Sequence, residues 1–111
     1  MTGNMTGNMT DDQTGMDGNV ASGTKPVLMD FFATWCGPCK TQKPILEELE
    51  NKYGDKVTFN AIDLDENQQL ASEYGIYAVP TLIILKDGVE VKRFIGVTEG
   101  SVLASELDKI L

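Results

Sequence analysis

The segment VLMDFFA, at residues 27–33, runs directly into a long amphipathic stretch, and this junction constrains the fold more than any other feature of the chain. A short apolar run with one acid is typical of a strand buried on both faces. The following stretch, to about Tyr53, carries its apolar side chains on one face and predicts a helix with a kink at Pro44. A buried strand that feeds a helix in this way favours an α/β fold.

The rest of the sequence extends this alternation. VTFNAIDL predicts a second buried strand, NQQLASEY a short helix that ends at Gly75, and TLIIL and VEVKRFIG a hairpin around Lys86-Asp87-Gly88. The C-terminal segment predicts a closing helix whose apolar face is formed by Leu103, Leu107, Ile110 and Leu111. The order β-α-β-α-β-β-α predicts an α/β fold with a mixed central sheet of about four strands flanked by helices.

The first 25 residues differ in composition from the remainder. MTGNMTGNMT repeats a four-residue unit, and Gly, Asn, Thr, Asp and Ser dominate as far as Lys25. These residues favour turns over regular structure and offer few apolar side chains to bury. We predict a flexible low-complexity arm over residues 1–25 and one folded domain over residues 26–111. A short helix capped by Thr10 is the alternative for part of the arm.

Charge and cysteine content narrow the classes of function. The 111 residues include 17 acids and nine bases, a net charge of −8, with no histidine. This balance argues against nucleic acid and anionic membranes as partners, because both need clustered Lys and Arg. We find no stretch apolar enough to span a membrane, no signal peptide and too few cysteines for a disulfide-rich secreted scaffold. We therefore expect a cytoplasmic protein, and we also expect it to be a monomer.

The two cysteines, Cys36 and Cys39, stand at the predicted strand–helix junction. They could be half of a zinc site, but the chain offers no further Cys or His, which leaves only a metal shared between chains. They could form a passive disulfide, although so short a loop adds little stability. The pattern favours a dithiol that cycles. Cys36 at the helix N-terminus is favoured as a thiolate, and Cys39, one turn further and less exposed, can resolve the bond.

The sequence also resembles the thioredoxin family. The resemblance rests on DFFATWCGPCK, YGIYAVPTLIILKDG and FIGVTEGSVL, in the family's order, and spans Pro26 to Leu111. It implies the thioredoxin fold, with the usual first strand absent or poorly formed here because the arm lacks apolar alternation. It further implies a protein-disulfide reductase that carries electrons in cell redox homeostasis and binds no cofactor or metal. Its partners would be disulfide-containing target proteins and a thioredoxin reductase, either flavin- and NADPH-dependent or ferredoxin-linked.

The resemblance assigns roles to residues around the cysteines. Cys36 is implied as the nucleophile and Cys39 as the resolving thiol. Gly37 and Pro38 between them match a reductase rather than an oxidase or isomerase. Trp35 is implied as an indole beside the site, and packing in the core is the alternative.

Three further residues are implied in binding target proteins. Val79 would offer its backbone to a substrate strand, and Pro80 would be a cis proline facing the disulfide. Gly96 would leave room on the neighbouring loop, although a simple turn glycine is the alternative.

Asp30 is the most informative acid because it interrupts an apolar strand. Burial would raise the pKa of its carboxyl group, and the resemblance implies a base that helps to deprotonate Cys39. The alternative is a strand in which Asp30 faces water. Ala61 stands where many bacterial thioredoxins carry a lysine, so we expect the pKa of Asp30 to be raised further.

Two other classes of function remain open from the sequence. A binding module, in which the protein acts as a scaffold and the chemistry is incidental, would survive replacement of both cysteines by serine. An oxidase or isomerase would have a redox potential well above that of a reductase, and the Gly-Pro dipeptide argues against it.

The composition of the arm yields a first prediction. Deletion of Met1–Ser22 should leave the denaturant midpoint and the reduction of insulin disulfides close to those of the full chain, because removing disordered residues is nearly neutral. A fall of more than about 2 kcal/mol in the free energy of unfolding would show that the arm packs on the domain.

Overall fold

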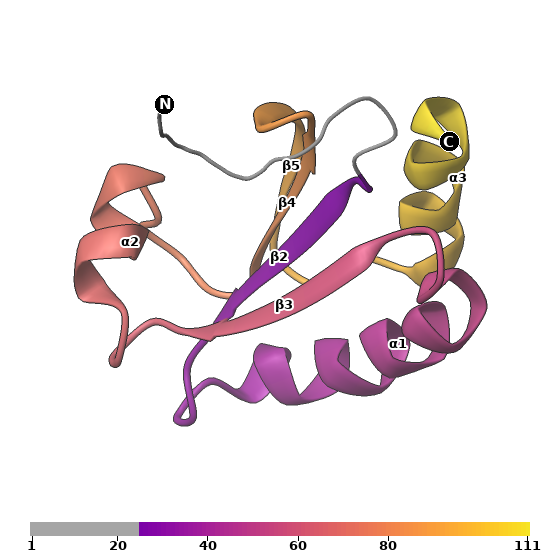
Figure 1. Ribbon diagram of the computed structural model, residues 1–111. Coiled ribbons are helices and arrows are strands. Elements are labelled where there is room, and N and C mark those ends of the chain that lie inside the picture. Colours follow the sequence, from indigo (N-terminus) through magenta and orange to yellow (C-terminus); the bar gives the residue numbers. More distant parts are fainter. Residues whose placement is uncertain (1–24) are drawn as a thin grey trace, which may run out of the picture.

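A computed structural model describes residues 25–111 of the chain. Its strands are β2 (Val27–Phe32), β3 (Thr58–Asp63), β4 (Thr81–Lys86) and β5 (Val89–Ile95), and its helices are α1 (Gly37–Tyr53), α2 (Gln68–Glu73) and α3 (Gly100–Ile110). The predicted order β-α-β-α-β-β-α is confirmed (Figure 1). The predicted arm, apart from Lys25, and the question of a preceding strand lie outside the described residues.

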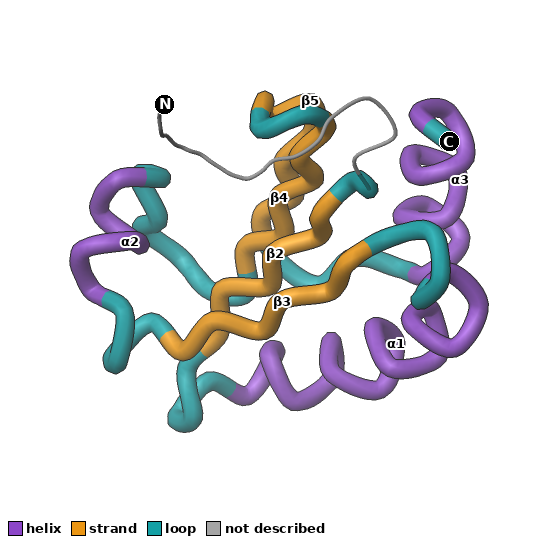
Figure 2. Tube along the Cα trace, in the orientation of Figure 1, coloured by secondary structure: helices purple, strands orange, loops and turns teal. Residues whose placement is uncertain are grey.

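The strands form a mixed sheet in the order β3-β2-β4-β5 (Figure 2). β2 and β3 are parallel, with α1 as the crossover between them, and β4 is antiparallel to both β2 and β5. The mixed four-stranded sheet predicted from the sequence is therefore confirmed. β2 lies in the interior of this sheet, and its C-terminal end leads into the cysteine segment.

The hairpin between β4 and β5 forms as the sequence predicts. Asp87 and Gly88 have φ angles of 54° and 79°, so both lie in the left-handed region. Two consecutive left-handed residues are typical of a type I′ turn, whose twist matches that of the flanking strands. The turn places β5 at one edge of the sheet, with the loop that follows it close to the start of β4.

Alternate residues of β2 and β4 supply the two halves of the core. One cluster lies under α1 and α3 and is formed by Leu28, Leu46, Leu49, Tyr53, Val57, Leu82, Ile84, Leu103 and Leu107. The other lies under α2 and is formed by Met29, Phe31, Ala71 and Ile83. Figure 1 shows α1 and α3 on the side of the sheet away from α2. Because side chains alternate along a strand, Asp30 lies on the same face as Leu28, toward α1.

Two sequence predictions about burial are wrong. VTFNAIDL was expected as a buried strand, yet Thr58, Asn60 and Ala61 are exposed. The reason is that β3 stands at the edge of the described sheet and pairs with β2 alone. Leu111 was placed on the apolar face of the last helix, but it follows the end of α3 and is half exposed. The open flank of β3 leaves cavities between β3 and α1 that reach Asp30.

Candidate active site

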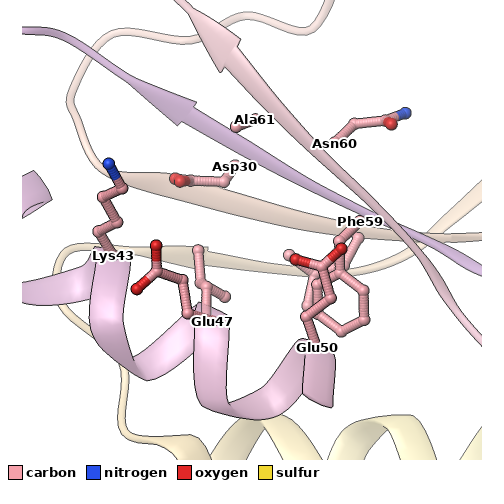
Figure 3. Close-up of a pocket in the computed structure, with 9 residues that line it drawn as sticks. Asp30, Lys43, Glu47, Glu50, Phe59, Asn60 and Ala61 are labelled. Carbon is pink, nitrogen blue, oxygen red and sulfur yellow. The ribbon is translucent and has the colours of Figure 1, made fainter. Parts of the chain in front are cut away.

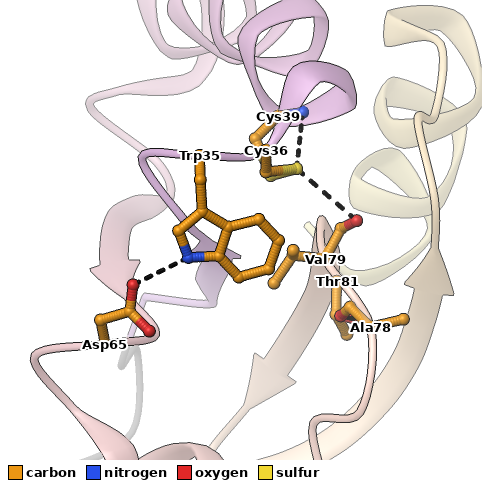
Figure 4. Close-up of a disulfide and its surroundings, with 7 residues drawn as sticks. All are labelled: Trp35, Cys36, Cys39, Asp65, Ala78, Val79 and Thr81. Carbon is orange, nitrogen blue, oxygen red and sulfur yellow. Dashed lines mark hydrogen bonds between the residues drawn. A yellow bond between two sulfur atoms is a disulfide. The ribbon is translucent and has the colours of Figure 1, made fainter.

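The candidate active site lies where β2 ends and α1 begins (Figure 4). Cys36 is the N-cap of α1, Cys39 lies in its first turn, and the two form a disulfide with their Cα atoms 5.3 Å apart. The backbone N–H of Cys39 donates a hydrogen bond to Cys36 Sγ at 3.1 Å. The first N–H groups of a helix have no partner within the helix. They therefore stabilise negative charge on Cys36 Sγ once the disulfide is reduced.

Gly37 and Pro38 form the first positions of α1, and both are exposed. Proline suits this turn because its missing N–H would have no helical partner there. A Cβ atom added to Gly37 would meet no other atom within 4 Å. The surface beside the disulfide is therefore open at this dipeptide.

The expected difference in exposure between the cysteines is not found. In the disulfide form Cys36 is 4% exposed and Cys39 is 7% exposed, because both pack in one cluster with Ala33, Phe32 and Val79. The prediction that Cys39 is the less exposed of the two is wrong for this form. The sulfur atoms differ in their surroundings instead. Cys36 Sγ lies beside backbone groups of α1 and Val79, whereas Cys39 lines a cavity that it shares with Asp30.

The segment preceding β4 lies against the disulfide (Figure 4). Val79 O is 3.7 Å from Cys36 Sγ, and the Val79–Pro80 peptide bond is cis, as the resemblance implied. A disulfide sulfur carries no proton, so this approach becomes a hydrogen bond only when Cys36 is a thiol. The backbone of Val79 thus lies beside the Cys36 end of the disulfide.

Gly96 joins the same neighbourhood from the loop after β5. Its N–H donates a hydrogen bond to Pro80 O at 2.8 Å, and its φ of 97° lies in the left-handed region that favours glycine. A Cβ atom built on Gly96 would point into open space. The structure therefore brings Val79, Pro80 and Gly96 together on one side of the disulfide.

Trp35 lies at the surface rather than in the core, so packing in the core is excluded. Its side chain is 67% exposed, and Nε1–H donates a hydrogen bond to Asp65 Oδ2 at 2.9 Å (Figure 4). Asp65 was missed by the sequence analysis because it lies 30 residues away, in the turn after β3. The hydrogen bond restricts the orientation of the indole ring, which directly precedes Cys36 in the chain.

Asp30 is half buried on the face of β2 that α1 covers. Burial raises the pKa of its carboxyl group from 3.8 to about 6, and within residues 25–111 its Oδ1 atom has no hydrogen-bond partner. A cavity of about 180 Å³ connects this carboxyl group to Cys39, with Phe32, Lys43 and Ala61 completing the lining. A cavity of this size, with the charged residues Asp30 and Lys43 in its wall, can hold water.

A lysine that the sequence analysis did not expect lines the cavity beside Asp30, and it comes from α1 rather than from β3. Ala61 stands opposite Asp30 in the β2–β3 ladder, as the sequence comparison assumed. Lys43 of α1 lines both cavities that Asp30 lines, and Figure 3 shows the Asp30 carboxyl end directed toward the Lys43 side chain. The sequence analysis considered only β3 as the source of a cation, and therefore missed Lys43.

The described part of the chain offers no cluster of metal ligands. Among residues 25–111, no group of three or more His, Cys, Asp or Glu side chains could hold a metal ion. The helices of this part are also too short or too polar to cross a membrane.

A dithiol–disulfide pair at a helix N-terminus, beside a cis proline and on a mixed sheet, defines a thiol–disulfide oxidoreductase of the thioredoxin fold. The family model described as Thioredoxin matches residues 8–109. The chain belongs to the thioredoxin family and is a protein-disulfide reductase. The matched range begins inside the predicted arm, so the boundary at residue 26 stays a prediction.

Individual relatives agree with this assignment. The chain is 47% identical to a thioredoxin of Bacillus subtilis over 77% of its own length and 82% of that protein. It is 45% identical to a thioredoxin of Alicyclobacillus acidocaldarius over 80% of its length and 85% of that protein. Among solved structures, a mutant thioredoxin from Halobacterium salinarum superimposes with a TM-score of 0.74 at 38% identity, covering 80% of this chain and 77% of that chain. Membership of the family implies two kinds of partner, a reductase and proteins that contain disulfides.

Asp30 yields a prediction of pH-dependent stability. Its pKa in the folded protein lies above the ordinary value of 3.8, so the folded state binds the proton more tightly than the unfolded chain. The free energy of unfolding therefore falls as the pH rises from 3.8 to about 6, and the loss levels off above that. The variant Asp30→Asn lacks this ionisation. The free energy of unfolding of Asp30→Asn, relative to that of the parent, should therefore increase by on the order of 2 kcal/mol from pH 3.5 to pH 7.5. A fully buried carboxyl group would give a larger increase, but Asp30 is partly solvated.

The measurement is a set of urea midpoints for both proteins at both pH values. Each protein serves as its own reference, so any cost of the substitution that does not depend on pH cancels. A difference between the two proteins that is the same at both pH values would contradict a raised pKa of Asp30.

Proposed function

We propose that the protein reduces target disulfides in two exchanges, in which Cys36 attacks and Cys39 resolves. The observation that carries this assignment is the position of Cys36 at the N-cap of α1, where its sulfur accepts the Cys39 N–H. A thiolate is the nucleophile in thiol–disulfide exchange, and the helix N-terminus favours the thiolate of Cys36 over that of Cys39.

In the first exchange the Cys36 thiolate attacks one sulfur of the target disulfide. The Cys36–target bond forms, the target disulfide breaks, and the second target sulfur leaves as a thiolate that takes a proton from solvent. In the second exchange Cys39 loses its proton and attacks Cys36 Sγ. The Cys36–Cys39 bond forms, and the first target sulfur leaves as a thiolate and is protonated. Two electrons and two protons thus pass to the target.

We assign Asp30 as the base that accepts the proton of Cys39. The shared cavity supports this role, because it gives the carboxyl group access to Cys39 by way of water. The pKa of about 6 also suits a base at neutral pH, since the carboxylate form predominates while its affinity for a proton remains appreciable.

We propose that target chains bind in a groove around the disulfide. Its proposed walls are Trp35 with Gly37 and Pro38 on one side, and Val79, Pro80 and Gly96 on the other. An extended target segment would pair with the backbone of Val79, beside Cys36 Sγ. The exposed indole of Trp35 supplies apolar contact area at the edge of this groove.

The cellular setting follows from the chemistry. We propose a monomer whose domain over residues 26–111 suffices for activity in the cytoplasm, where the dithiol form is maintained. A flavin- and NADPH-dependent or a ferredoxin-linked thioredoxin reductase would restore the dithiol. Reduction of the oxidised protein by one purified reductase of each kind, with its own electron donor, would identify which serves.

Cysteine variants test the order of attack. Cys36→Ser should abolish reduction of insulin disulfides, whereas Cys39→Ser should retain target proteins as mixed disulfides that dithiothreitol releases, because the resolving thiol is missing. The measurement is non-reducing electrophoresis after incubation of each variant with insulin, and the variant lacking both cysteines is the control. Trapping by Cys36→Ser in place of Cys39→Ser would reverse the assignment.

A further inference from the structure

Gln42 is a fully buried polar side chain that the proposed chemistry does not use. It lies on α1 one turn after Cys39, and its exposed fraction is 0%. Burying an amide side chain is costly unless its donor and acceptor are both satisfied. The partners of Gln42 therefore show what this residue does.

Both ends of the Gln42 amide bind the backbone of a single residue in the loop between β5 and α3. Gln42 Nε2 donates to Thr98 O at 3.0 Å, and the Thr98 N–H donates to Gln42 Oε1 at 2.7 Å. The two residues are 56 positions apart in the sequence. A paired donor and acceptor fixes both the distance and the orientation of the loop relative to α1, which one hydrogen bond would not do.

The contact continues from Thr98 to the proposed groove. Thr98 Oγ1 donates to Gly96 O at 3.1 Å, and the Gly96 N–H donates to Pro80 O at 2.8 Å. A continuous chain of hydrogen bonds thus runs from α1, which carries the disulfide, through the loop to the segment that faces it. Along this chain, Gln42 provides the side-chain link to the helix.

We propose that Gln42 is a positioning residue for target binding, which holds the Gly96–Thr98 loop at a fixed distance from the N-terminal end of α1 and so sets the width of the groove. This inference rests on the proposed role of Gly96 and Pro80 in contacting target proteins. The rate at which the protein reduces a small disulfide that makes no contact with the loop should not depend on Gln42. The binding of a protein disulfide should depend on Gln42, because the chain that flanks the disulfide lies along the groove.

The test compares the dithiol form of the parent with that of Gln42→Met. Methionine has a similar length and is readily buried, but it forms neither hydrogen bond. Single-turnover reduction is measured at increasing insulin concentration, and the reduction of 5,5′-dithiobis(2-nitrobenzoate) is measured in parallel. The half-saturating insulin concentration should rise about fivefold, while the limiting rate and the rate with the small disulfide stay within about twofold.

Two further variants distinguish an effect on the loop from a general loss of stability. Tyr53→Phe removes a hydrogen bond of 2.8 Å to Asp108 at the other end of α1, so it lowers stability without touching the loop, and should leave both substrates unaffected. Thr98→Ala keeps both Gln42 bonds but removes the link to Gly96 O, and should raise the half-saturating insulin concentration by about twofold.

The possible outcomes test the role of Gln42 separately from the binding of target proteins in the groove. Gly96→Ala adds a methyl group in the open space beside the loop and also strains the loop, because Gly96 has a φ of 97°. Both effects should weaken insulin binding if the groove is correct. Weakening by Gly96→Ala but not by Gln42→Met would overturn the role of Gln42 and leave the groove intact. No weakening by Gly96→Ala would overturn the groove. Equal losses for insulin and the small disulfide in Gln42→Met would show that Gln42 acts on the disulfide helix rather than on the loop.

Discussion

The hydrogen bond from the Cys39 N–H to Cys36 Sγ is the interaction on which the rest of the site depends. It exists because β2 ends directly before α1, so that Cys36 becomes the N-cap and receives the free N–H groups of the first turn. The same geometry keeps the two Cα atoms 5.3 Å apart, within the range that a disulfide can bridge. A single backbone arrangement therefore favours the thiolate of one cysteine and keeps the other within bonding distance of it.

The sheet supports this arrangement from both sides. β2 is held between β3 and β4, and the buried side chains of its two faces pack under α1 with α3 and under α2. The start of β4 brings Val79 and Pro80 to the disulfide, and the loop after β5 brings Gly96. Asp30 interrupts the apolar pattern of β2 where a cavity reaches Cys39.

Local pattern in the sequence was sufficient to predict most of the fold. Apolar runs and helical periodicity predicted every described helix and strand, and the Lys86-Asp87-Gly88 segment predicted the turn of the hairpin. The burial of β3 was predicted wrongly, because apolar content alone does not show whether a strand lies at the edge of a sheet. The relative exposure of Cys36 and Cys39 was also predicted wrongly, since it depends on packing against Val79, which is distant in the sequence.

The residues missed by the sequence analysis share one property. Asp65 binds Trp35, Lys43 lines the Asp30 cavity, and Gln42 binds Thr98, and each contact joins segments that meet only in the folded chain. Gln42 offered one weak signal, a polar residue on the helix face otherwise occupied by Cys39, Leu46, Leu49 and Tyr53. Its partner could not be inferred, because helical periodicity shows which face is buried but not what it is buried against.

The most direct test of the central claim is the alkylation of the reduced protein by iodoacetamide at neutral pH, with the modified cysteine identified by peptide mass spectrometry over time. Because the helix N-terminus favours the thiolate of Cys36, we expect Cys36 to be modified much faster than Cys39. The same order of modification should persist at high salt in urea-free buffer, because the N–H groups that stabilise the thiolate lie next to it. The difference between the two cysteines should disappear when the protein is unfolded. Equal rates for the two cysteines in the folded protein, or faster modification of Cys39, would contradict the assignment of Cys36 as the nucleophile.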